Sequence, residues 1–228
     1  MTETFFKFPS TPHLKKYDNI DIRSNKILSS DKLTAFLKNE IVVEEKVDGS
    51  NLGISFDSDG DIKIQNRGSY LTLSKMKQWN NLDMWIDKNI NYFFEVLLDR
   101  YILFGEWCYA QHTIKYNNLP DWFIGFDIYD KQQNIFLSTK LRNDMLNRMN
   151  IHIIPCIDKG MYNLYKLEKL LLHTQSYFSD ELVEGLYLRH EDDDKLINRV
   201  KLVNPTFIQS IDLHWSKTNL KCNKVVYK

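Results

Sequence analysis

A two-residue alternation of apolar and polar side chains around one tight turn constrains this fold more than any other feature of the sequence. Two alternating runs flank the pair Asp59-Gly60: Leu52, Ile54 and Phe56 before it, and Ile62 and Ile64 after it. Aspartate followed by glycine is the usual chemistry of a turn that joins neighbouring antiparallel strands. The sequence therefore predicts a β-hairpin over this segment.

Other segments predict strands and helices that come in clusters and do not alternate strictly. Strands are expected within 41–43, 101–109, 122–129, 183–189 and 200–203, and helices within 30–37, 74–100, 138–149 and 164–171. Ser30-Asp31 and Ser138 are candidate caps for the first and third of these helices. Clustered elements of both kinds are typical of an α+β domain with largely antiparallel sheets flanked by helices.

The composition is that of an ordinary soluble globular protein, with 43% hydrophobic and 26% charged residues. No apolar run is long enough to span a bilayer, and the first ten residues lack the apolar core of a signal peptide. We therefore expect an intracellular, cytoplasmic protein with no membrane partner. The formal net charge of zero argues mildly against tight non-specific binding to nucleic acid, although a local basic groove remains compatible with it.

Lys46 stands where the strand predicted over 41–43 runs out into a turn, in the segment Glu45-Lys46-Val47-Asp48-Gly49-Ser50-Asn51. A lysine there is held on a rigid element with its amine directed into a cleft. To attack a phosphate the amine must lose its proton, so its ordinary pKa of roughly 10.4 must fall, and neighbouring cations and a metal ion would lower it. Taken alone, Lys-x-Asp-Gly is more often a solvated surface turn, in which Asp48 shapes the chain.

Further candidates follow in order along the chain. Arg67, after the hairpin, offers a guanidinium to a phosphate or a terminal hydroxyl. Glu106 ends the apolar run Phe104-Gly105-Glu106, where a carboxylate is costly unless it has a partner, such as an arginine in an ordinary ion pair. Phe126 offers an aromatic face to a base, or is simply part of the core.

The last candidates lie in the strands predicted near the end of the sequence. Glu184 begins one strand, and Arg199 and Lys201 share one face of the next because side chains alternate with period two. A solvated strand face would carry the same two cations. The six histidines show no metal-ligand spacing, and His13, in a Pro-flanked loop, is the only one singled out as a candidate.

The ordered motifs resemble those of the covalent nucleotidyltransferase superfamily, which comprises ATP- or NAD-dependent ligases and GTP-dependent RNA capping enzymes. The matching segments are Lys46-Val47-Asp48-Gly49, Phe104-Gly105-Glu106, Phe126-Asp127-Ile128, Glu184-Gly185-Leu186 and Arg199-Val200-Lys201. They span residues 44–203, most of the chain. Each motif is weak alone, and all five in order are strong evidence for the resemblance.

Within this superfamily the sequence most resembles the RNA ligase 2 family of nick-sealing enzymes. The likeness lies in Glu45 before the lysine, Ser50-Asn51 after it, and the segments 201–207 and 8–14. The resemblance implies a nucleotidyltransferase (ATP-grasp-like) domain that uses ATP and Mg²⁺ or Mn²⁺ to join RNA 5′-phosphate and 3′-hydroxyl ends through a lysyl-AMP intermediate.

The resemblance also implies roles for individual residues. Lys46 would be the nucleophile, and Arg199 and Lys201 the cations that stabilise the transition state. The other nucleotide-binding residues would be Glu45 at the edge of the base, Asn51 and Arg67 at the ribose and phosphates, Glu106 at the ribose hydroxyls, Phe126 against adenine, and Glu184. Glu184 would also help to hold the metal ion, through water.

Two departures from the family pattern matter. Arg199 replaces the usual first lysine of the last motif, which keeps the charge but changes its geometry. Too few residues follow Lys201 for the oligonucleotide-binding barrel of DNA ligases or the helical C-terminal domain of RNA ligase 2 relatives. We therefore expect residues 1–228 to form a single adenylyltransferase domain, to which a separate subunit would add nucleic-acid binding.

Three alternative functions stay open at this point. A minimal DNA ligase or a capping guanylyltransferase would use the same nucleophile. A catalytically inactive nucleic-acid-binding domain would keep the fold without the chemistry.

Overall fold

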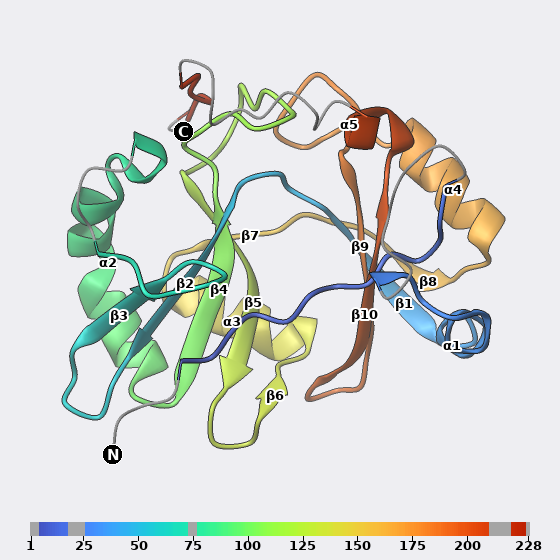
Figure 1. Ribbon diagram of the computed structural model, residues 1–228. Helices are drawn as coiled ribbons and strands as arrows, with labels where there is room; N and C mark the ends of the chain where they lie inside the picture. The colour runs from blue at the N-terminus through green and yellow to red at the C-terminus, as the bar shows by residue number, and fades with distance from the viewer. Residues whose placement is uncertain (1–4, 18–25, 73–76, 210–219, 227–228) are drawn as a thin grey trace.

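Two β-sheets stand side by side at the centre of the computed structural model, which describes residues 5–17, 26–72, 77–209 and 220–226 (Figure 1). The first sheet has the order β3-β2-β4-β5-β6, with β7 beside β5, and the second the order β10-β9-β1-β8. The strands of the first sheet are β2 (Ser50–Phe56), β3 (Ile62–Gln65), β4 (Tyr101–Trp107), β5 (Phe123–Asp130), β6 (Ile135–Phe136) and β7 (His152–Ile153). Those of the second are β1 (Glu40–Glu45), β8 (Cys156–Met161), β9 (Gly185–Glu191) and β10 (Leu196–Val203). All pairings are antiparallel except β5 with β7, so the α+β prediction is confirmed.

The hairpin predicted from the sequence is β2–β3. Its register runs from Gly53 opposite Gln65 to Phe56 opposite Ile62. Gly60, in the turn, has φ of 84°, a left-handed conformation that costs glycine little and other residues more. The turn residue and the alternation therefore specify the same structure.

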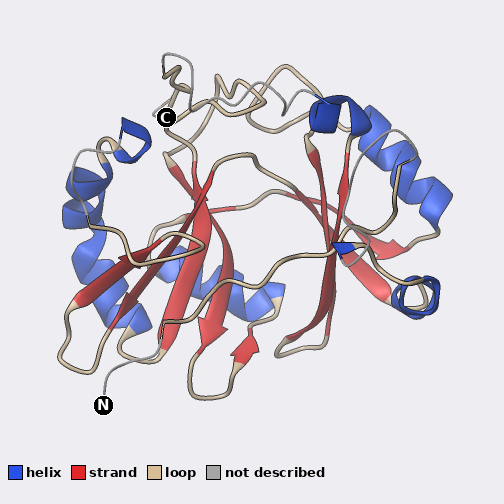
Figure 2. Cartoon of the chain, viewed as in Figure 1, coloured by secondary structure: helices blue, strands red, loops and turns tan. Residues whose placement is uncertain are grey.

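Helices cover the outer sides of both sheets (Figure 2). α2 (Leu82–Leu97), preceded by the short helix η2 (Lys77–Trp79), and α3 (Thr139–Arg148) share an apolar cluster with the first sheet. α1 (Ser30–Phe36) and α4 (Leu164–His173) pack on the second sheet, and α5 (Pro205–Gln209) follows β10. Ser138 caps α3 by accepting a hydrogen bond from the Leu141 amide, as predicted. The capping prediction for Ser30-Asp31 is wrong: Ser29 is the N-cap, and no side chain caps that end of α1.

The two faces of the second sheet differ sharply in chemistry. One face joins the apolar cluster with α1 and α4 and includes Val43, Leu188 and Val200. The other face carries the neighbouring residues Glu44, Tyr187 and Lys201, which are register partners across β1, β9 and β10. Alternation along each strand therefore sends polar side chains toward the first sheet.

The segment 5–17 crosses from the first sheet to the second (Figure 1). Phe8 packs with Phe104 and Phe126 of the first sheet. Farther along, the Lys201 amide donates to the Pro12 carbonyl at 2.9 Å, and the Leu14 amide donates to the Lys201 carbonyl at 2.8 Å. One segment thus contacts both sheets where they meet.

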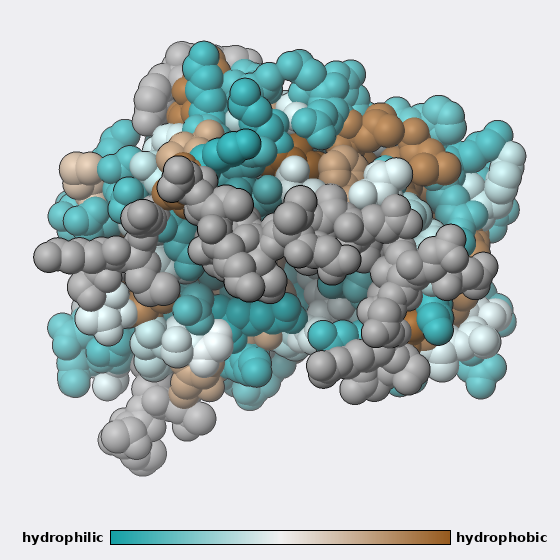
Figure 3. All heavy atoms as spheres, turned by 45° about the horizontal axis from the view of Figure 1, so that its top comes forward, coloured by the Kyte–Doolittle hydropathy of each residue, from teal (hydrophilic) through white to brown (hydrophobic). Residues whose placement is uncertain are grey.

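The sequence did not reveal β8, which pairs with β1. Its residues Cys156–Met161 are mostly exposed and lack alternation, so no local pattern marks them as a strand. Among the coloured residues on the face drawn in Figure 3, hydrophilic side chains are the more widespread and hydrophobic ones lie in separate patches. Among the described residues, no helix has the length and apolarity needed to cross a membrane.

Candidate active site

A pocket opens where the two sheets and the segment 5–17 come together. The second sheet contributes the end of β1, with Tyr187 and Lys201 beside it, and the first sheet contributes Asn51, Glu106 and Phe126. The lining residues are Phe8, Thr11, Glu44, Glu45, Lys46, Val47, Asn51, Arg67, Glu106, Phe126, Ile154, Tyr187 and Lys201. The pocket therefore brings together seven residues proposed from the sequence as the nucleophile and its nucleotide-binding partners: Glu45, Lys46, Asn51, Arg67, Glu106, Phe126 and Lys201.

Lys46 follows directly on β1, and its amide donates to the Gly185 carbonyl at 2.9 Å. Its Nζ forms an ion pair with the Glu184 carboxylate. Burial opposes the charge on the amine, but the carboxylates of Glu184, Asp48 and Glu106 outweigh burial and raise the pKa of Lys46. The expectation of a pKa lowered by neighbouring cations is therefore wrong for the free protein, because carboxylates surround the amine.

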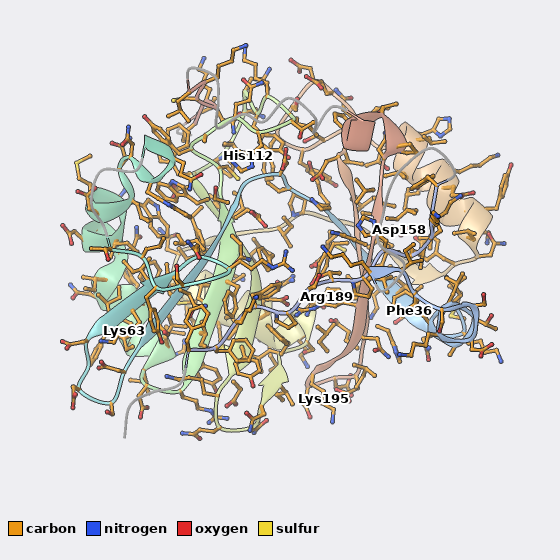
Figure 4. The ribbon with its side chains drawn as sticks, in the orientation of Figure 1. Phe36, Lys63, His112, Asp158, Arg189 and Lys195 are labelled. Atoms are coloured by element: carbon orange, nitrogen blue, oxygen red, sulfur yellow. The ribbon has the colours of Figure 1, made fainter. Side chains whose placement is uncertain are left out.

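Asp48 anchors the turn after the lysine. Its amide donates to the Tyr116 hydroxyl at 2.8 Å, and its carboxylate accepts from the Thr113 amide at 2.7 Å and lies 3.7 Å from His112 Nδ1. Burial acts to raise the pKa of Asp48, but His112 and the charge of Lys46 lower it to about 2. Asp48 thus shapes the turn, as predicted, by tying it to the loop 108–122 (Figure 4 labels His112). Sequence spacing did not single out His112.

Asn51 and Glu106 are direct partners on β2 and β4. Asn51 Oδ1 and Glu106 Oε2 are both buried and have no hydrogen-bond partner among the described residues. Burial raises the pKa of Glu106 to about 8, although the charge of Lys46 acts in the opposite direction. Buried oxygens are rarely left without partners. Two such oxygens in a pocket wall favour a ligand that donates hydrogen bonds.

Cations and an aromatic ring complete the wall. Burial, reinforced by the charge of Lys46, lowers the pKa of Lys201 to about 8. Arg67 is exposed at the rim and donates weakly to the Pro9 carbonyl at 3.4 Å. Phe126 is 9% exposed and meets Phe8 edge to face, with ring centroids 5.4 Å apart. Phe126 is therefore both part of a core cluster and part of the pocket.

Arg199 does not line the pocket. Its guanidinium donates to Asp127 at 2.6 Å and lies over the rings of Phe8 and Phe136, 4.5 and 4.2 Å from their centroids. The structure therefore places Arg199 behind the pocket wall, although Arg199 and Lys201 share one strand face as expected.

Buried ion pairs behind the pocket were not predicted from the sequence. Asp127, fully buried, accepts from both Arg189 and Arg199 and so joins β5 to β9 and β10. Arg142 of α3 donates to Glu44 of β1 at 2.6 Å. In Figure 4, Arg189 lies between the two sheets. These pairs hold the two sheets together around the pocket.

Glu45 contributes to the lining, but its carboxylate is engaged elsewhere. One oxygen accepts from the Ser176 hydroxyl at 2.5 Å and the other from the Tyr177 amide at 3.0 Å. Burial raises the pKa of Glu45, and these two bonds partly offset the rise. Each oxygen of Glu45 therefore already accepts one hydrogen bond from the protein.

A divalent cation fits the chemistry of the pocket. The described residues contain no cluster of three or more metal-ligating side chains. Mg²⁺, however, usually keeps several waters and takes one or two carboxylates together with substrate phosphates. Glu184, proposed from the sequence for that task, is 8% exposed and is not among the lining residues, but its ion pair with Lys46 places its carboxylate next to the pocket.

His13 lies beside the pocket cations and gives a testable pH effect. Burial and the charges of Lys201, Lys46 and Lys26 lower the pKa of His13 from 6.5 to about 4. Between these values the unfolded chain binds more protons than the folded one, so His13 reduces stability as pH falls through this window. In urea unfolding from pH 7 to pH 4, we expect the parent to lose more stability than His13→Asn. Parallel losses in the two proteins would contradict the assignment.

Comparison with known proteins supplies a family and a fold. The RNA ligase family model matches residues 39–203. No curated protein sequence matches the chain.

Solved structures of RNA ligase from Naegleria gruberi are similar to this chain. A mutant with ATP and Mn has a TM-score of 0.66 and 17% identity, with 92% of this chain and 60% of that chain covered. The enzyme with PPi has a TM-score of 0.60 and 18% identity, with coverage of 92% and 65%. A mutant with AMP and Mn has a TM-score of 0.59 and 16% identity, again with coverage of 92% and 65%. The chain thus spans less than two thirds of the length of these proteins, and identities this low establish a shared fold.

Proposed function

Because this chain belongs to the RNA ligase family, we propose that it is an ATP-dependent RNA ligase acting through a covalent lysyl-AMP intermediate. The observation that carries the proposal is the pocket that Lys46 shares with Phe126 and with the unpaired oxygens of Asn51 and Glu106. An amine can attack phosphorus, an aromatic ring can hold a base, and the two oxygens can accept hydrogen bonds from ribose hydroxyls. ATP presents all three complementary groups.

In the first step, Lys46 Nζ would attack the α-phosphorus of ATP. A nitrogen–phosphorus bond forms, the bond from this phosphorus to the bridging oxygen breaks, and pyrophosphate leaves. The ammonium must lose one proton before attack, and the nitrogen loses a second, to solvent, as the phosphoramidate forms. Glu184 is the nearest acceptor for the first proton, because it already pairs with the ammonium and burial raises its own pKa.

The charge on the phosphates would be met by Lys201 and Arg67 from opposite sheets. Arg199 binds Asp127 and is not among the lining residues, so we assign it to holding the ring of Phe8 in place. Glu184 would also help to hold Mg²⁺ or Mn²⁺ through water, and the ion would supply positive charge beside the phosphates.

Later steps would pass AMP to an RNA 5′-phosphate, after which a 3′-hydroxyl attacks and AMP leaves. The RNA ligase 2 type is the assignment that the motifs around Lys46 and Lys201 support. We further propose that residues 1–228 act as one adenylyltransferase domain in RNA repair. A separate nucleic-acid-binding subunit would fit the formal net charge of zero.

The proposal is tested by incubating the protein with ATP labelled at the α-phosphate and Mg²⁺ or Mn²⁺. We expect label on the denatured protein from ATP and not from GTP. Label from GTP alone would point to a capping guanylyltransferase. A folded protein that takes no label under either metal would overturn the proposal and favour an inactive binding domain.

A further inference from the structure

Segment 220–226 lies beside the loop 108–122, which joins β4 to β5 (Figure 1). Backbone hydrogen bonds connect the two near the beginning and near the end of the loop. The Gln111 amide donates to the Lys221 carbonyl at 2.9 Å, and the Leu119 amide donates to the Lys224 carbonyl at 3.1 Å. The family model matches residues 39–203, so this segment holds the loop from outside the matched part of the chain.

Asn223 lies at the centre of this contact and is 5% exposed. Its Nδ2 donates to the carbonyls of Cys108 and Ala110, at 2.8 and 3.2 Å, and its Oδ1 accepts from the Tyr116 amide at 2.8 Å. Its own amide donates to the Tyr109 carbonyl at 3.0 Å. The side chain thus uses both of its donors and its acceptor to tie the start of the loop to Tyr116.

Tyr116 connects Asn223 to the turn that follows the nucleophile. The Tyr116 side chain is fully buried, and its hydroxyl accepts from the Asp48 amide at 2.8 Å. Val47, which separates Lys46 from Asp48, packs in the same apolar cluster as Tyr116. The loop therefore holds this turn through one hydrogen bond and through apolar packing.

The backbone of Lys46 is anchored on both sides. Before the turn, the Lys46 amide donates to the Gly185 carbonyl at 2.9 Å, and after it Asp48 is held by the loop. A Cβ added at Gly49 would lie 2.9 Å from the Trp107 carbonyl oxygen, so the turn packs closely on the residue that precedes the loop. Attack on phosphorus depends on alignment, and a misplacement of about 1 Å can slow a reaction about 100-fold. The shape of the loop therefore bears on the rate at which Lys46 reacts.

We propose that Asn223 is a positioning residue for Lys46, acting through Tyr116 and Asp48. By holding the loop 108–122 in one shape, it aligns the amine for attack on the α-phosphorus. This inference rests on the proposed function for its reaction. Neither Asn223 nor Tyr116 is among the residues that line the pocket. Their loss should therefore slow the attack by Lys46 and leave the binding of ATP unchanged.

The first test measures label transfer from ATP to Asn223→Ala over a range of ATP concentrations. We expect the maximal rate to fall about 10- to 100-fold, while calorimetry gives an ATP affinity within about twofold of the parent value. Thermal unfolding confirms that the variant is folded at the temperature of the assay. A folded variant that labels at the parent maximal rate, or that loses only ATP affinity, would overturn the inference.

The second test uses Tyr116→Phe, which keeps the ring and removes only the hydroxyl that binds Asp48. We expect the same loss of maximal rate with ATP affinity retained. Tyr129→Phe is the matched control, because the Tyr129 hydroxyl, 3.2 Å from Asn134 Oδ1, has no bond to the turn, and it should label at the parent rate.

The double variant Asn223→Ala, Tyr116→Phe shows whether the two residues act along one path. If Asn223 acts through the Tyr116 hydroxyl, adding Asn223→Ala to Tyr116→Phe should slow labelling by less than about threefold. Independent losses would multiply, because residues that share no partner usually have additive effects on the activation free energy. Multiplied losses would overturn the inference.

Hydrogen exchange of the Asp48 amide, followed by NMR without nucleotide, tests the same contact apart from activity. We expect this amide to exchange at least about 10-fold faster in Asn223→Ala, relative to the amides at the centre of β2. Unchanged exchange at Asp48 would overturn the inference.

The two proposals fail in different ways. A parent that takes no label on Lys46 refutes the ligase, and exchange at Asp48 then decides whether Asn223 holds the turn. A parent that takes label, together with an Asn223→Ala variant that labels at the same maximal rate, refutes the positioning role and leaves the ligase.

Discussion

Replacing Lys46 with methionine will abolish transfer of label from ATP to the protein, a fall of at least about 1,000-fold. Methionine keeps much of the side-chain volume and removes the amine. Lys201 shares the pocket but lies on a different strand, so it cannot take over a reaction that depends on alignment at the end of β1. The measurement is the rate of label incorporation with the folded variant, confirmed by its thermal unfolding.

Lys63→Met is the control for this substitution. Lys63 lies on β3, away from the pocket, and pairs with Asp57 at 2.7 Å (Figure 4). We expect Lys63→Met to label at the parent rate. Label retained in Lys46→Met, or lost equally in Lys63→Met, would show that Lys46 is not the nucleophile.

The second large effect concerns stability. Asp127→Ala removes the carboxylate that binds Arg189 and Arg199, and Arg189 is fully buried. Removing one partner of a buried ion pair leaves an uncompensated charge, which typically costs about 3–5 kcal/mol. We expect a loss of this size in the free energy of unfolding, measured by denaturant titration.

Glu40→Ala gives the matched comparison. Glu40 and Lys159 also join two strands, at 2.9 Å, but both side chains are more than half exposed. Exposed pairs contribute about 0–1 kcal/mol. Equal losses in the two variants would mean that Asp127 does not hold the sheets together.

The sequence predicted the parts of the fold that local patterns determine. The hairpin β2–β3 follows from alternation and Gly60, and α3 follows from its spacing and from the Ser138 cap. β8 became a strand through its pairing with β1, a contact between residues more than 100 positions apart that no local pattern encodes. Local periodicity therefore predicts elements better than it predicts their partners.

The same reason explains what was found and missed in the site. Motifs in order identified Lys46, Glu106 and Phe126, because each is marked by its immediate neighbours. The pair Arg142 and Glu44 spans 98 positions and the pair Arg189 and Asp127 spans 62, so neither leaves a local signature. Such pairs become visible only when the sheets are assembled.

The bonds that join Pro12 and Leu14 to Lys201 bear on synthesis at the ribosome. The segment 5–17 leaves the exit tunnel long before Lys201 has been translated, so these hydrogen bonds cannot form until late in synthesis. Both edges of β1 likewise stay without a partner strand during synthesis, because β8 and β9 are translated more than 100 residues later. Exposed strand edges and apolar faces make partly made chains prone to aggregation. We therefore expect the nascent chain to depend on chaperones until β10 emerges, and its folding to be slow for its size.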